Sequence, residues 1–154
     1  MKTRMLLVAV LLTALVTPLW ADNMADRVEL DRSVIRTEKK AIIAKNMNFT
    51  EMEAEAFWPV YHKFQQAIRP VYDRKVKLIM TYAKDYEKLS DKEANNLVKD
   101  YLRIQKDQVK VKQHYVRKFN NVMPSKKVAR YYQLEQKMDA VIDAELAANI
   151  PLVR

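Results

Sequence analysis

The chain has 154 residues, no Cys, no Gly and a formal net charge of +9 at pH 7. Without Gly it lacks the residue on which phosphate-binding loops, nucleophile elbows and tight hairpin turns depend, and long helices are favoured instead. Without Cys it can form neither a disulfide framework nor a thiol site.

The N-terminus has the layout of a secretory signal peptide. A basic start is followed by an apolar run over residues 5–16, and Ala21 then offers a small residue for cleavage. The apolar run is shorter than the roughly 20 residues that a membrane-spanning helix needs. We therefore expect residues 1–21 to be removed and residues 22–154 to form a single exported domain that does not span the membrane. An uncleaved membrane anchor is the alternative.

Apolar residues at helical spacing predict an all-α fold with four helices in one domain. The pattern indicates a first helix over about residues 25–45, a second over about 51–89, a third that begins after Ser90, and a fourth that starts at Ser125 and ends near Asn149. The second helix contains Pro59 and Pro70, each of which removes a backbone donor, so we expect kinks or a short break there. The result is a long, kinked helical hairpin.

Capping signals mark where the helices begin. Thr50 with Glu53, and Ser90 with Glu93, have the spacing of capping boxes, in which the two residues satisfy each other's free backbone N–H groups. Pro124 precedes the start of the fourth helix.

The segment from Tyr101 to Arg130 is strongly basic, whereas the last helix is acidic on balance. Aromatic residues alternate with the cations, as they do on nucleic-acid-binding surfaces, but export argues against a nucleic-acid ligand. Either the aromatics face the core and the charges are merely solvated, or the cations form a binding surface that attracts acidic segments of unfolded proteins or anionic envelope components. The candidate binding residues are Arg103, Lys106, Lys110, Lys112, Arg117, Lys118, Lys126, Lys127 and Arg130.

Catalytic and metal-binding motifs are weak. The two histidines, His62 and His114, are the candidates for a metal, but no His-x-x-x-His or Glu-x-x-His pair places two ligands on one helical face. We expect no cofactor and no enzymatic activity. The aromatic residues Phe57, Trp58 and Tyr61 are interpreted as a packing cluster, because large aromatics usually supply core energy.

Several strings resemble known exported proteins. Phe49-Thr50-Glu51-Met52-Glu53 and Met123-Pro124-Ser125-Lys126-Lys127 are similar in position to the two Leu-Thr-x-x-Gln motifs of the periplasmic Spy/CpxP family, with substitutions in both. A closer resemblance is to uncharacterised exported helical proteins of Gram-negative bacteria. It is carried by Phe57-Trp58-Pro59-Val60-Tyr61, by residues 127–135 and by residues 145–153. The Spy-like resemblance implies a curved homodimer that holds unfolded clients without ATP.

The sequence therefore predicts a non-enzymatic periplasmic binding protein. It would act as a chaperone-like protein or an envelope-stress adaptor and hold its clients on a basic, aromatic-edged surface. One alternative is a sensor or regulatory partner, linked to a metal through His62 or His114. Another is a structural component of the envelope.

Overall fold

The computed structural model describes residues 37–153. The predicted signal peptide of residues 1–21 and most of the predicted first helix lie outside this range. The chain divides into a unit of residues 1–38 and a unit of residues 39–154. The second unit contains the core, the ion network and the groove.

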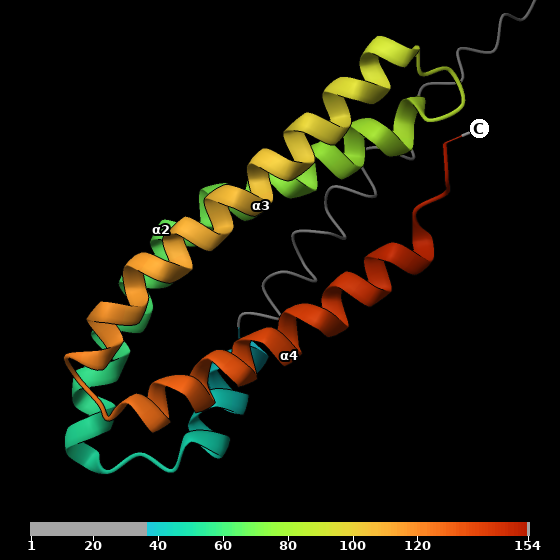
Figure 1. Cartoon of the computed structure of the whole chain (residues 1–154). Helices are drawn as coiled ribbons and strands as arrows, with labels where there is room; N and C mark the ends of the chain where they lie inside the picture. The colour runs from blue at the N-terminus through green and yellow to red at the C-terminus, as the bar shows by residue number, and fades with distance from the viewer. Residues whose placement is uncertain (1–36, 154) are drawn as a thin grey trace, which may run out of the picture. The chain divides into compact units, whose positions relative to one another are not determined.

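The described part of the protein is all-helical, with four helices and no strand, as the sequence predicts. Residues 37–47 belong to the first helix, here called helix 37–47. It is followed by α2 (Glu51–Asp85), α3 (Asp91–Asn120) and α4 (Ser125–Asn149) (Figure 1).

The predicted starts of α2, α3 and α4 are confirmed, whereas that of the first helix lies outside the described residues. The backbone N–H of Glu53 donates to Thr50 Oγ1 at 3.2 Å, and the backbone N–H of Thr50 donates to Glu53 Oε2 at 2.9 Å. Ser90 and Glu93 form the same reciprocal pair at the start of α3. Pro124 occupies the capping position of α4. Each capping box satisfies donors that the first helical turn would otherwise leave free.

The predicted course of the second helix needs correction. Kinks or a short break are expected at Pro59 and Pro70; α2 passes both prolines without interruption, so a break is absent. Both prolines are exposed, and the solvent side of a packed helix tolerates weakened backbone hydrogen bonds. α2 also ends at Asp85 rather than at Leu89, because a turn comes next in which Lys88 N–H donates to the Asp85 carbonyl at 2.9 Å. This turn lets the chain become extended at Ser90, as the cap of α3 requires.

Asn48 shapes the connection between helix 37–47 and α2. Its φ of 48° lies in the left-handed region, which Asn enters more easily than other non-glycine residues. In a chain without Gly, an Asn at this position allows the first helix to stop and the Thr50 cap to form directly after it.

α2 and α3 form a long antiparallel hairpin (Figure 1). The direction is fixed by cross-helix contacts: Tyr115 Oη donates to the Lys63 carbonyl at 2.9 Å, and Arg74 pairs with Asp107 at 2.9 Å further along. α4 then returns beside the hairpin. Tyr132 Oη donates to the Lys112 carbonyl at 2.7 Å.

The fully buried apolar residues gather at one end of the hairpin, where α2 begins and α3 ends. Phe57, Phe119 and Tyr131 are completely buried at its centre, with ring centroids 4.7–5.4 Å apart. Burial of large aromatics is the main stabilising contribution here. The remaining core residues are Ile43, Met47, Tyr61, Phe64, Ile68, Val71, Ile104, Tyr115, Met123 and Val128.

Candidate binding site

An acidic stripe runs along one face of α4. Glu135, Asp139 and Asp143 are spaced four residues apart and therefore lie above one another on the helix. Lys39 of helix 37–47 pairs with Glu135 at 3.2 Å and with Asp139 at 2.8 Å. Lys112 of α3 pairs with Asp139 at 2.9 Å, and Lys75 of α2 pairs with Asp143 at 2.5 Å. The stripe thus ties α4 to each of the other described helices.

The centre of this ion network is shielded from water. The side chains of Lys39, Glu135 and Asp139 are 9%, 2% and 14% exposed. Burial alone would raise the pKa of Asp139, but Lys39 and Lys112 outweigh it and hold that pKa below its ordinary value of 3.8. Burial opposes the charge of Lys39, yet Glu135 and Asp139 raise the pKa of Lys39 above 10.5. Both groups therefore remain charged at neutral pH.

Neutral polar side chains extend the network. Tyr72 Oη donates to Asp139 Oδ2 at 3.1 Å, and Gln108 Nε2 donates to Tyr72 Oη at 3.4 Å. Nearby, Glu135 Oε2 and the Tyr131 hydroxyl are buried without a hydrogen-bond partner among the described residues. A buried ion pair contributes little net stability, but an arrangement that separates its charges is costly. Any shift of α4 along the hairpin would separate these charges, so we interpret the network as fixing the position of α4.

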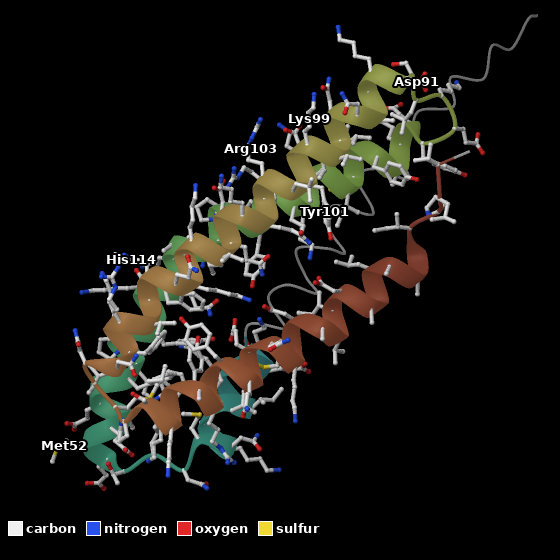
Figure 2. All side chains as sticks on the ribbon, in the orientation of Figure 1. Met52, Asp91, Lys99, Tyr101, Arg103 and His114 are labelled. Carbon is white, nitrogen blue, oxygen red and sulfur yellow. The ribbon has the colours of Figure 1, made fainter. Side chains whose placement is uncertain are left out.

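A groove begins where the acidic stripe ends. It lies between the second half of α4 and the neighbouring parts of α2 and α3, and its volume is about 530 Å³. Tyr101 points from α3 toward α4 (Figure 2). The wall is almost entirely apolar. It comprises Lys75, Leu78, Ile79, Tyr82, Ala94, Leu97, Val98, Tyr101, Asp143, Leu146, Ala147, Ile150 and Val153.

The polar groups at the groove are already engaged within the chain. Tyr82 Oη donates to the Pro151 carbonyl at 2.6 Å, and Tyr101 Oη accepts from Gln105 Nε2 at 2.6 Å. Lys75 and Asp143 pair with each other. Small-molecule sites usually present a few converging polar groups that orient the ligand. This groove offers a ligand mainly apolar contact, which suits binding that tolerates many sequences.

Part of the predicted basic surface is used to hold the fold together. Lys112 belongs to the ion network around Asp139. Lys127 pairs with Glu53 and also donates to the Asn48 carbonyl at 3.0 Å. Arg130 Nε donates to the Asn46 carbonyl at 2.7 Å. These cations therefore link α4 and α3 to their neighbours.

The other predicted cations lie on the outside. Arg103 and Lys110 pair with acidic residues on their own helix, at 3.2 Å and 3.4 Å, in exposed positions where such pairs contribute little. Lys118 lies over the ring of Tyr115, 5.1 Å from its centroid. Lys106 and Arg117 on α3, and Lys126 at the start of α4, are also exposed. Some of the predicted cations thus make interhelical contacts, whereas the others are exposed on α3 or at the start of α4.

The two histidines lie on the surface, whereas the aromatic cluster is internal. His62 and His114 are exposed on α2 and α3, and the described residues contain no group of three or more His, Asp or Glu residues suited to a metal ion. Phe57 is fully buried, and its ring centroid lies 5.2 Å from that of Trp58 and 5.7 Å from that of Tyr61. These rings pack in the core.

Sequence reasoning did not identify the ion network or the groove. Lys39, Tyr72 and Asp139 were not among the predicted site residues. The four-residue spacing of the acidic side chains in α4 is a signal that could have revealed Asp139 and its acidic neighbours. That spacing indicates a charged face, but it does not say which cations meet it.

The chain has no significant match among protein-family models, curated proteins or solved structures. None of the helices in the described range is long and apolar enough to cross a membrane. The geometry of the described residues is therefore the basis for assigning a function.

Proposed function

We propose that this chain is a non-enzymatic periplasmic binding protein that holds non-native polypeptides in a chaperone-like manner or as an envelope-stress adaptor. The observation that carries the proposal is the apolar groove of about 530 Å³ between α4 and the hairpin. Unfolded proteins expose apolar side chains, and a groove whose polar groups are already engaged can accept many such side chains. The resemblance to the Spy/CpxP family implies the same kind of activity.

The sequence predicted that clients are held on the basic surface. We propose instead that the exposed cations mainly affect the rate at which clients are encountered. Apolar groove contacts would supply most of the affinity, and the exposed cations of α3 would speed the encounter with acidic clients. Contributions of these two kinds respond differently to salt. Electrostatic attraction between exposed charges is screened as salt rises, whereas apolar burial is not weakened in this way.

Suppression of aggregation tests the proposal. A chemically unfolded model protein is diluted into buffer with the purified chain, without ATP, and light scattering is recorded at low and high salt. The groove variants are Leu146→Asp and Ile150→Asp, because both residues are half-buried in the groove wall. A charge there opposes apolar binding, and we expect affinity for clients to fall by about tenfold or more, since a buried Leu contributes about 1.5–3 kcal/mol.

Val141→Asp is the matched control, because Val141 lies on α4, is 68% exposed and does not line the groove. We expect this variant to protect the client as well as the natural chain does. Circular dichroism verifies that all variants remain helical. Absence of suppression at any stoichiometry would refute the proposed function. Protection that survives the groove substitutions but disappears at high salt would assign clients to the basic surface instead.

A further inference from the structure

The outward face of α3 carries two parallel stripes that do not serve the contacts between the described helices. The apolar stripe contains Leu102 and Val109, which are 56% and 52% exposed; Val98, at 57%, continues it to the rim of the groove. The basic stripe beside it consists of exposed cations separated by three, four or seven residues, so they share one side of the helix. Its members are Lys92, Lys99, Arg103, Lys106, Lys110 and Arg117.

The opposite side of α3 carries the internal contacts. Ile104, Tyr115 and Phe119 are buried against the core, and Lys112 reaches Asp139 of α4. Figure 2 shows Lys99 and Arg103 pointing away from α4. A ligand bound to the outward face would therefore leave the groove between α4 and the hairpin accessible.

The chemistry of the stripes identifies the type of partner. An apolar stripe bordered by Lys and Arg on a helix is the pattern of segments that lie in the interface of an anionic membrane. A peptide helix bound here would contact a single convex helix and would lack the flanking walls that a groove provides. A second copy of the chain would cover the apolar stripe but would bring the same excess of cations, so the basic stripe would still lack counter-charges.

We propose that the outward face of α3 binds the surface of bilayers that contain anionic phospholipids. α3 lies parallel to the membrane, with Leu102 and Val109 at the boundary between headgroups and acyl chains and the cations against lipid phosphates. The protein remains peripheral, and the groove stays open to the aqueous side. Membrane binding would occupy the exposed cations of α3 but leave most of the groove wall uncovered, because Val98 is the one residue of the apolar stripe that also lines the groove.

Vesicle co-sedimentation tests the proposal. Protein expressed from the full coding sequence, and purified as the cell processes it, is mixed with phosphatidylcholine vesicles with or without about 30% phosphatidylglycerol at low salt. We expect binding only to the anionic vesicles. Each basic residue near an anionic surface strengthens partitioning by about fivefold. Replacing Lys99, Lys106 and Arg117 with Gln should therefore weaken binding about 100-fold.

A control with the same net charge separates the stripe from general electrostatics. Lys63, Lys77 and Lys137 are exposed cations on α2 and α4, and replacing all of them with Gln should reduce binding far less. Leu102→Ser with Val109→Ser should also weaken binding, whereas Val141→Ser should not. Equal losses in the two triple-Gln variants, or equal binding to neutral vesicles, would overturn the proposal.

Spin labelling reports on orientation. Because the chain has no Cys, Leu102→Cys creates a single labelling site, and Gln136→Cys on α4 provides an exposed reference. On anionic vesicles the label at position 102 should gain collisions with oxygen, which concentrates in the bilayer, and the label at 136 should not. Binding to poly-glutamate without binding to anionic vesicles would instead identify an acidic protein partner and refute the membrane assignment.

Discussion

Substituting Asp139 with Asn should strongly destabilise the protein, because this carboxylate joins α4 to the rest of the fold. Asp139 accepts hydrogen bonds from Lys39 at 2.8 Å, Lys112 at 2.9 Å and Tyr72 at 3.1 Å. Asn keeps the shape but removes the charge, and it leaves two shielded ammonium groups with less compensation. Removing one partner of a buried pair costs about 3–5 kcal/mol. Lys39 retains Glu135 and Lys112 is 24% exposed, so we expect a loss of about 3 kcal/mol.

Urea denaturation followed by circular dichroism measures this loss. With a denaturant slope of about 2 kcal/mol per molar, the midpoint should fall by about 1.5 M. Asp100→Asn is the control, because Asp100 pairs with Arg103 on the surface and its loss should cost less than about 0.5 kcal/mol. Adding Lys112→Met to Asp139→Asn should restore part of the stability by removing an unpaired charge. If Asp139→Asn shifts the midpoint no more than Asp100→Asn does, the network does not hold α4.

Two further predictions concern the stability of the protein in acid and the hydroxyl group of Tyr131. The pKa of Asp139 is held below its ordinary value by Lys39 and Lys112 despite burial, and the hydrogen bond from Lys127 lowers the pKa of Glu53. The unfolded chain therefore binds more protons in acid. The melting temperature should stay nearly constant from about pH 7 to pH 5 and drop below about pH 4; a decline already complete at about pH 5 would contradict this. Tyr131→Phe should leave the free energy of unfolding unchanged or raise it by about 1 kcal/mol, because the buried hydroxyl has no partner among the described residues and its removal relieves a desolvation cost. Tyr115→Phe should lower that free energy, because it removes a hydrogen bond worth about 1 kcal/mol. A loss above about 2 kcal/mol in Tyr131→Phe, measured by urea denaturation, would reveal an additional partner of that hydroxyl.

The helices could be predicted because their signals are local. Thr50 with Glu53, Ser90 with Glu93, and Pro124 act within one helical turn, so the residue types and spacing suffice to locate the starts. The end of α2 was less predictable. Lys88 and Leu89 have no strong stop signal, and the geometry of the connection to α3 decides where the helix ends.

The candidate site could not be predicted in the same way, because its contacts join distant parts of the chain. Lys39 is separated from Asp139 by 100 positions, and helix periodicity does not specify which helices become neighbours. Lys112 illustrates the difficulty: it belongs to a basic segment, yet it turns inward to meet an acidic residue of α4. The groove likewise depends on the course of α4 relative to the hairpin.

The one-sided placement of the core has a consequence for local unfolding. Among the residues whose burial is described, α2 has no buried residue after Val71, α3 has none before Ile104, and α4 has none after Glu135. Segments with little buried apolar contact open at a lower free energy than the rest of a fold, and their amide hydrogens exchange sooner. The chain would thus consist of a persistent cooperative unit around Phe57 and a less protected one around the groove. Such a division would let the groove reshape itself around different occupants while the aromatic end keeps the protein folded.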